Sequence, residues 1–232
     1  WRGRWSGGWW RGGGWVGWVR AVWVGSWGGA VEPPCRMRDV GYAVAGSTVG
    51  SVDKEVMLDG STMLGGGGRI GLSSTGVHSS GFSLVRKVFN LSEKNVNLYV
   101  EELGATLGET LLTPTKIYVK PVLSVLKNHT VRAISHVTGG GFYENIPRMM
   151  KDGLTAKIEL ASFPKLPIFS LLQQQGKIPE RDMYNTFNMG VGMCMAVPKE
   201  EADAVLADPK ASGAAAYRIG GVVGVEEGVA LF

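Results

Sequence analysis

One stretch of sequence decides how the chain is arranged: Ile134-Ser135-His136-Val137-Thr138-Gly139-Gly140-Gly141-Phe142-Tyr143-Glu144-Asn145-Ile146-Pro147-Arg148. An apolar, β-branched run from Val131 to Val137 leads into three consecutive glycines, and a segment of helical character follows them. The pattern predicts a strand-loop-helix junction. Glycine permits positive φ and close approach of the backbone, and the free N–H groups at the start of a helix favour negative charge. We therefore predict a phosphate-binding loop here; a simple tight turn is the alternative.

A second junction of the same kind lies upstream. A short strand at Arg69 to Ser74 leads into a loop of serine, glycine and histidine, residues 75–81, and apolar residues then recur at helical spacing from Phe82 to Phe89. Ser79 or Ser80 is predicted to cap that helix, and hydroxyls beside free backbone N–H groups predict a second anion site. Capping alone is the alternative for these serines.

Histidine is rare in this chain, and two of its three histidines lie in these loops. His78 and His136 each follow a strand in a glycine-rich stretch, whereas His129 lies in a plain connection. An imidazole can orient a phosphate or transfer a proton near neutral pH. We predict that His78 is catalytic; a structural role is the alternative for a single loop histidine.

Other polar residues are predicted to bind a phosphorylated substrate. Arg148 could clamp a phosphate with two hydrogen bonds, and Asn145 and Asn188 could hydrogen-bond a sugar or an amide. A solvated surface charge and turn-capping amides are the respective alternatives. The full set of predicted substrate- and phosphate-binding residues is Ser74, Gly76, Ser79, Ser80, Gly81, His136, Thr138, Gly139, Gly140, Gly141, Asn145, Arg148 and Asn188.

Motifs of several other chemistries are missing from the sequence. It contains no nucleotide-binding P-loop, no Cys/His zinc pattern, no nucleophile elbow and no cluster of aspartates for magnesium, so no metal-binding residue is predicted. Cys35 and Cys194 lie far apart without metal-ligand spacing, which favours a reduced, intracellular protein.

The remaining pattern predicts a layered domain. Because strands and helices interleave without strict alternation, we expect an α/β (α+β) fold in which helices cover a mixed sheet. Further helices are expected at residues 96–105, 115–126, 168–174 and 199–206. Further strands are expected at 41–52, 131–137, 154–160, 216–223 and 229–232, and another one at the end of the segment 185–197.

Composition separates the first 38 residues from the rest. All eight tryptophans lie between Trp1 and Trp27, and residues 1–34 lack a helical or strand period. Residues 1–38 hold six arginines and one acid, whereas residues 39–232 hold 18 basic and 19 acidic side chains. The basic pI therefore belongs to residues 1–38, and we infer no nucleic-acid binding by the folded part from it. We interpret residues 1–38 as a non-globular leader, artefactual or disordered; an aromatic-basic arm for nucleic acid or membrane is the alternative.

Five motifs together resemble the phosphoribosylformylglycinamidine cyclo-ligase family, also called AIR synthetases. In chain order they are Leu72 to Lys87, Leu111 to Lys120, His136 to Arg148, Thr186 to Met193 and Tyr217 to Gly220. The resemblance implies that residues 69–232 form a C-terminal domain like that of the AIR synthetase superfamily. It also implies that residues 39–68 are the last strands of an N-terminal ATP-binding domain.

The resemblance also implies an activity. Enzymes of this family serve de novo purine biosynthesis, where they use ATP and magnesium to close formylglycinamidine ribonucleotide into aminoimidazole ribonucleotide. A small ribonucleotide substrate, a homodimer and a cytoplasmic location, or a plastid one, are implied as well. Nucleic acid is not an expected partner. A membrane is not expected either, since the longest uncharged stretch is shorter than the ~20 residues that span a bilayer.

This sequence departs from the family pattern in two respects. The family's nucleotide- and metal-binding segments precede the region of similarity, and the tryptophan-rich residues 1–38 take their place. Ser80 stands where the family usually has Asn, which weakens one expected substrate hydrogen bond. We therefore expect the 232-residue chain to be inactive as a cyclo-ligase. A non-catalytic paralogue that binds a phosphorylated ligand or a full-length subunit is the alternative.

Overall fold

The computed structural model describes residues 21–28, 45–53, 56–58, 60–63, 65–211, 213–224 and 228–232. The chain divides into two compact units, Trp1–Met57 and Leu58–Phe232. The family-like motifs all lie in the second unit, so the functional argument concerns that unit alone.

The first unit contains a two-stranded antiparallel ladder. β1 (Ala21–Gly28) pairs with β2 (Ala45–Val52) along its whole length. The sequence predicts β2 but no strand within residues 1–34, so β1 is a correction: valine and tryptophan suit strands, and β2 supplies the backbone partners. The interpretation of residues 1–38 as a leader stays a prediction, because much of that range lies outside the described residues.

A six-stranded mixed sheet forms the centre of the second unit, in the order β10-β7-β9-β3-β8-β6. The pair β10 and β7 is parallel, and the other neighbouring pairs are antiparallel. This arrangement confirms the predicted mixed sheet. Its strands are β3 (Gly68–Ser73), β6 (Ala133–His136), β7 (Thr155–Ile158), β8 (Val191–Val197), β9 (Ala216–Val223) and β10 (Gly228–Leu231).

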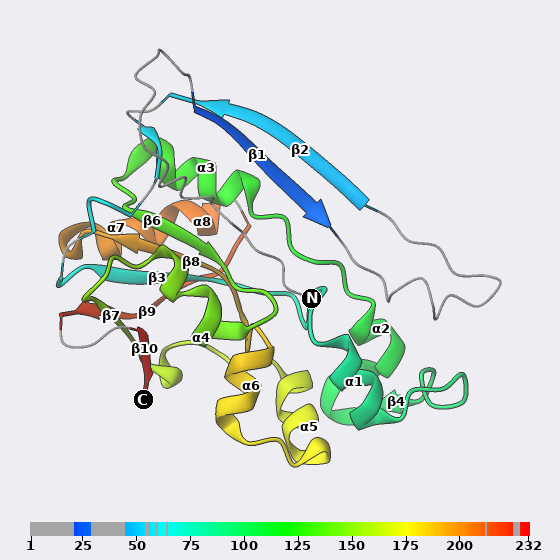
Figure 1. Cartoon of the computed structure of the whole chain (residues 1–232). Coiled ribbons are helices and arrows are strands. Elements are labelled where there is room, and N and C mark those ends of the chain that lie inside the picture. The colour runs from blue at the N-terminus through cyan, green and yellow to red at the C-terminus, as the bar shows by residue number, and fades with distance from the viewer. Residues whose placement is uncertain are drawn as a thin grey trace. The chain divides into compact units, whose positions relative to one another are not determined.

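Helices cover both faces of this sheet, as predicted (Figure 1). Ile70 and Leu72 of β3 belong to one buried hydrophobic cluster, while Ile219 and Cys194 of the neighbouring strands belong to the other. One layer consists of α3 (Val119–Asn128), α7 (Ala202–Val205) and α8 (Ala207–Ala211). The other consists of α1 (Phe82–Phe89), α2 (Leu107–Leu111), α4 (Gly141–Asn145), α5 (Pro167–Gly176) and α6 (Glu180–Thr186).

The helix predicted at residues 96–105 is wrong. This segment contains β4 (Tyr99–Val100) and the 3-10 turn η3 (Glu101–Leu103), and β5 (Ala105–Thr106) follows it. The helix begins one step later, at α2, because Thr106 and Glu109 form a capping box there: the Glu109 N–H donates to Thr106 Oγ1 at 3.2 Å, and the Thr106 N–H donates to Glu109 Oε2 at 2.9 Å.

Two other helices differ from their predicted bounds. The helix expected at 115–126 begins only after Tyr118, whose hydroxyl donates to the Ser73 carbonyl at 2.9 Å and so holds the chain against the sheet. The charged residues 180–182 open α6, which the sequence does not predict; the helix forms because its inner side buries Met183 in the core.

The sheet topology brings the two predicted junctions together. β8 lies between β3 and β6 and runs antiparallel to both, so β3 and β6 end at the same edge of the sheet, next to the start of β8. We call this edge, with residues 74–81, 137–141 and 187–190, the loop edge. Both glycine-rich loops leave the sheet there because the strands that precede them are parallel to each other and share one neighbour.

Candidate functional site

The two glycine-rich loops meet at the loop edge. A Cβ atom added to Gly139 would lie 3.7 Å from the Oγ atom of Ser80, so the two loops are in van der Waals contact range. Backbone hydrogen bonds also fix both loops to the beginning of β8, from the Ser74 N–H to the Gly190 carbonyl (2.8 Å) and from the Val137 N–H to the Gly192 carbonyl (2.9 Å). The junctions that the sequence predicts separately thus form one structure.

His78 is held in the loop after β3 as a neutral imidazole. Its backbone is left-handed, with φ of 59°, and its side chain is only 8% exposed. The N–H groups of Thr75, at 3.1 Å, and Lys116, at 3.5 Å, donate to Nε2, which places the ring proton on Nδ1. Burial, with smaller contributions from His136 and Lys116, lowers the pKa of His78 to about 4. Nδ1 is buried and has no hydrogen-bond partner among the described residues.

A second histidine and a tyrosine join His78 in a buried ring cluster. The ring centroid of Tyr118 lies 6.3 Å from that of His78 and 6.1 Å from that of His136, in edge-to-face geometry. Burial lowers the pKa of His136, and it raises the pKa of Tyr118. The Nε2 atom of His136 is also buried without a partner in the described part of the chain. The cluster is therefore uncharged at neutral pH.

The serines of the first loop have separate roles. Ser79 Oγ lies 2.8 Å from Thr115 Oγ1, within hydrogen-bond range, and the buried Ser74 Oγ has no partner among the described residues. The sequence predicts that Ser79 or Ser80 caps α1, and this prediction is wrong. The N-cap is Gly81, with φ of 80°, because a Cβ atom at this position would collide with the ring of Phe187.

Asn145 braces the triple-glycine loop from inside. It is 2% exposed, and its Nδ2 atom donates to the carbonyls of Gly139 at 3.1 Å and Gly141 at 2.7 Å. Thr138 Oγ1 lies 3.5 Å from its Oδ1. Gly140 and Gly141 adopt positive φ, and a Cβ atom on Gly141 would clash with the backbone. The amide is engaged with the loop itself, so a direct substrate contact by Asn145 stays a prediction.

Asn188 connects the first loop to the start of β8. Its Nδ2 atom donates to the Gly76 carbonyl at 2.9 Å, and its Oδ1 atom accepts from the Gly190 N–H at 3.0 Å. The side chain is buried, and both ends of its amide are used. Its geometry corresponds to the turn-capping alternative, and its predicted contact with substrate is untested.

Arg148 lies in the 3-10 turn η4 (Pro147–Met149), just after α4. Its Nη2 atom is 3.6 Å from Glu144 Oε2, and its Nη1 atom donates to Asn145 Oδ1 at 3.4 Å. The guanidinium is half exposed and is balanced by a carboxylate one helical turn away. A phosphate clamp would have to compete with this ion pair, and the predicted clamp remains a prediction.

Sequence reasoning missed several residues that shape the loop edge. Tyr118 and Lys116 were assigned to a helix by their apolar surroundings, although both reach the end of β3: Lys116 Nζ donates to Ser73 Oγ at 2.9 Å. The structure shows that Tyr118 occupies the space beside Gly192. No local signal distinguishes residues 115–118 from a helix, because the contact that holds this segment comes from the end of β3.

The described residues do not fit ATP with magnesium at this edge. They contain no group of three or more His, Cys, Asp or Glu side chains that could hold a metal ion. Magnesium prefers oxygen ligands, whereas the loop edge presents neutral imidazoles, and the carboxylate of Glu144 beyond it is paired with Arg148. In the described part of the chain, no helix is long and apolar enough to cross a membrane.

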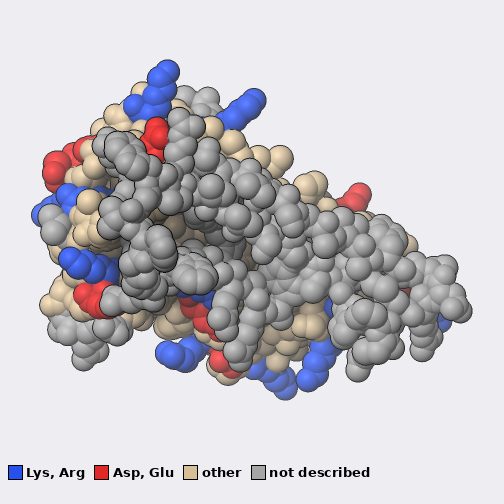
Figure 2. All heavy atoms as spheres, turned by 45° about the horizontal axis from the view of Figure 1, so that its top comes forward, with Lys and Arg blue, Asp and Glu red and all other residues tan. Residues whose placement is uncertain are grey.

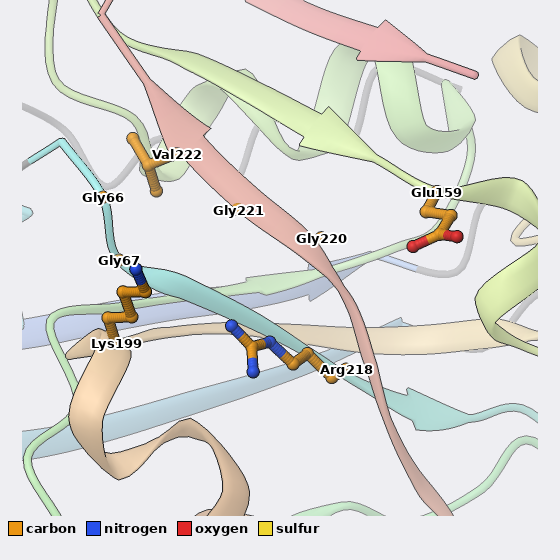
Figure 3. Close-up of a pocket in the computed structure, with 8 residues that line it drawn as sticks. All are labelled: Gly66, Gly67, Glu159, Lys199, Arg218, Gly220, Gly221 and Val222. Carbon is orange, nitrogen blue, oxygen red and sulfur yellow. The ribbon is translucent and has the colours of Figure 1, made fainter.

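A separate cavity of about 360 Å³ lies at the opposite end of β3 (Figure 3). It is lined by the glycine backbones at 66–67 and 220–221 and by Val222, with three charged side chains, Lys199, Arg218 and Glu159. Arg218 is already 3.4 Å from Asp203 Oδ1. No predicted site residue lines this cavity, so it is distinct from the loop edge.

Charged side chains of both signs lie on the face of the molecule shown in Figure 2. On the face shown in Figure 2, the coloured lysines and arginines alternate with acidic side chains around the rim and do not gather in one basic patch within the described part of the chain. A broad basic surface is what binding to nucleic acid would favour. The expectation of no nucleic-acid partner remains a prediction.

Comparison with known proteins matches this unit to one family. Residues 66–231 match the family described as AIR synthase related protein, C-terminal domain. A phosphoribosylformylglycinamidine cyclo-ligase of Agathobacter rectalis is 47% identical over 205 residues, which cover 88% of this chain and 60% of that protein. A protein of the same name from Brevibacillus brevis is 50% identical over 197 residues, which cover 84% and 57%. The chain thus spans about 60% of the length of these relatives.

Solved structures show the same fold at low identity. The thiamine-monophosphate kinase from Stenotrophomonas maltophilia K279a superimposes with a TM-score of 0.56 and 13% identity, over 80% of this chain and 56% of that one. The hydrogenase maturation protein HypE from E. coli superimposes with a TM-score of 0.50 and 20% identity, over 80% and 51%. At these identities the likeness concerns the fold alone.

Proposed function

Because the chain belongs to the AIR synthase related family through its C-terminal domain, we propose that it forms part of a phosphoribosylformylglycinamidine cyclo-ligase. The loop edge would bind the ribonucleotide substrate of that reaction. The relatives that carry this name extend well beyond the region shared with this chain, so the complete reaction is proposed only for a protein that also has the remaining part.

One observation carries the assignment of the loop edge. Three buried polar atoms there, Ser74 Oγ, His78 Nδ1 and His136 Nε2, have no partner within the described residues. Buried polar groups are normally hydrogen-bonded, and leaving one unpaired costs about 1–3 kcal/mol. A ligand that supplies the missing partners would recover this cost, and perturbed histidines in one place support a functional site.

Each group has a defined role in this proposal. His78 offers a neutral N–H donor at Nδ1, suited to an oxygen or an amidine nitrogen of the substrate. The glycine backbones at 139–141 allow the phosphate of the ribonucleotide to approach closely, since they lack side chains. Asn145 and Asn188 keep the two loops in shape through their hydrogen bonds.

ATP and magnesium would be bound outside the loop edge. The family reaction consumes ATP, but the described residues offer no fitting set of ligands, so no step through the nucleotide is derived for this chain. We assign that role to the portion of the relatives that this chain does not span. A homodimer and a cytoplasmic location, with a plastid as the alternative, belong to the same proposal.

Calorimetry with phosphoribosylformylglycinamidine tests the binding step. The 232-residue chain should bind the ribonucleotide, and the variant His78→Gln should bind it about ten-fold more weakly, which is the effect of one lost hydrogen bond of about 1.4 kcal/mol. His129→Gln is the matched control, because His129 lies at the far end of α3 and should leave the affinity unchanged. Equal affinities for the two variants would contradict the assignment.

A non-catalytic role is the alternative function. In that case the chain binds a phosphorylated ligand, or pairs with a full-length subunit, without turnover. An ATP-dependent assay for aminoimidazole ribonucleotide, run on the chain joined to the part of a relative that it does not span, separates the two candidates. Product formation would reject the non-catalytic role, whereas ribonucleotide binding without product would support it.

A further inference from the structure

Tyr118 occupies the space between the two histidines of the loop edge. Its ring makes edge-to-face contacts with His78 and His136 at centroid distances of 6.3 Å and 6.1 Å. Its hydroxyl donates to the Ser73 carbonyl at 2.9 Å, at the very end of β3. The side chain is 5% exposed, so it is a fixed part of the interior. A ring that is anchored at its tip and buried along its sides cannot easily change rotamer.

Gly192 in β8 creates the room for this tyrosine. A Cβ atom at Gly192 would collide with the Tyr118 hydroxyl and lie 2.8 Å from the His78 Cε1 atom. The same glycine accepts the Val137 N–H through its carbonyl, next to His136. The tyrosine therefore sits where β3, β8 and the end of β6 come together, and it touches both histidines from that point.

The polar surroundings of the cluster are few. Lys116 is the charged group that acts on His78, and its Nζ atom is directed to Ser73 Oγ at 2.9 Å. The Lys116 N–H and the Thr75 N–H both point at the Nε2 atom of His78. Tyr118 adds an apolar ring to this set, so it contributes shape and exclusion of water but no charge at neutral pH.

We propose that Tyr118 is a positioning residue that holds His78 and His136 in single ring orientations, with the unpaired Nδ1 and Nε2 atoms ready for a ligand. The inference rests on the proposed function of the loop edge, but it concerns the unliganded chain. The tyrosine acts through the histidines, and it fills the volume that water would otherwise enter.

Nitrogen-15 NMR of the histidine rings tests this role without ligand or turnover. In the unaltered chain His78 should show the Nδ1–H tautomer and a depressed pKa. Tyr118→Leu should admit water, mix the tautomers and raise the pKa of His78 by about one unit, a ten-fold increase in its protonated fraction. Tyr118→Phe keeps the ring and should leave both histidines unchanged, because only the bond to Ser73 is lost.

A control variant keeps the test decisive. Tyr184→Leu removes a buried tyrosine from the opposite face of the sheet and should lower stability without moving either histidine. Unchanged tautomers and pKa values in folded Tyr118→Leu would overturn the proposal. If the unaltered chain does not bind the ribonucleotide, the proposed function is rejected, but the NMR result on the role of Tyr118 still stands.

Discussion

Two places in the described part of the molecule bury polar atoms without hydrogen-bond partners, and they are unlike. At the loop edge the unpaired atoms come from three residues in two loops, Ser74, His78 and His136. In the interior of the sheet they are Nε and Nη1 of a single residue, Arg69, which is 0% exposed. Unpaired buried atoms indicate a ligand site where separate elements contribute them together. Where one side chain carries them alone, they lower the stability of the fold.

The surroundings of the two places support this distinction. Asn145 and Asn188 use their amides to fix the loops around the unpaired atoms, so the loop edge is constructed with hydrogen bonds. Arg69 instead contacts the sulfur atoms of Met63 and Met150. Burial lowers the pKa of Arg69, and burial raises the pKa of the nearby Cys194 thiol to about 11, so the thiol does not supply a counter-charge at neutral pH.

The largest effect should come from breaking the loop edge with Gly141→Ala. The backbone there has φ of +55°, and a Cβ atom would clash with the Tyr184 carbonyl oxygen. We expect a loss of about 4 kcal/mol in the free energy of unfolding, measured by urea denaturation. Gly65→Ala is the matched control, because no atom lies within 4 Å of a Cβ added there, and it should change stability little. Similar stabilities for the two variants would contradict the described loop.

Asn145→Ala should have the next largest effect. It removes the donor to the carbonyls of Gly139 and Gly141 and leaves the Gly141 carbonyl buried without it, which should cost about 3 kcal/mol in the same measurement. Because the triple-glycine loop loses its brace, ribonucleotide affinity should fall as well. Asn128→Ala offers a control on the exposed end of α3, where its single hydrogen bond to Asp208 should matter little. A stable Asn145→Ala protein with full affinity would show that the brace is dispensable.

Arg69→Met should act in the opposite direction. An unpaired buried guanidinium costs more than an apolar side chain of similar length, so the variant should be about 2 kcal/mol more stable. It should bind the ribonucleotide as the unaltered chain does, because Arg69 is distant in the sheet from the loops that follow β3. A fall in the melting temperature of Arg69→Met would show that Arg69 stabilises the fold, and it would contradict the distinction between the two places.

The effect that is smallest near neutral pH is the protonation of His78. The pKa of His78 is about 4 in the folded chain and about 6.5 when unfolded, so the unfolded state binds more protons between these values. Stability should therefore decrease as the pH falls from about 6.5 to about 4. His78→Gln should flatten this dependence, whereas Arg69→Met should retain it. Parallel stability curves for His78→Gln and the unaltered chain would reject the buried neutral histidine.

Much of the fold could be predicted because its strands are rich in apolar residues and are separated by glycine-rich or polar loops. β3, β6, β8 and β9 are recognisable from β-branched residues and their flanking glycines. The wrong helix at 96–105 has apolar residues at helical spacing. The capping box of Thr106 and Glu109 starts the real helix, α2, after that segment. α3 begins later than predicted because the Tyr118 hydroxyl bonds to the Ser73 carbonyl in β3, and a tertiary contact of this kind cannot be seen in the sequence of the helix itself.

The candidate site was only partly predictable. Glycine, serine and histidine in two loops indicated a site, and the five motifs indicated the family. That the loops touch depends on the pairing of β8 with both preceding strands, which is not a property of either loop. The inward orientation of Asn145 and the burial of Arg69 follow from the sheet and its helices, so the sequence gives no local sign of either.

The position of β8 between β3 and β6 also sets an order of assembly. The two loops are complete when residue 141 has been synthesised, yet the strands before them pair with β8 and not with each other. On the ribosome, the first two strands must wait until residues 191–197 emerge before they acquire their common neighbour. Contacts of such long sequence separation form late and slowly. The loop edge should thus be among the last parts of this unit to mature in a growing chain, although its two loops lie in the first two thirds of the sequence.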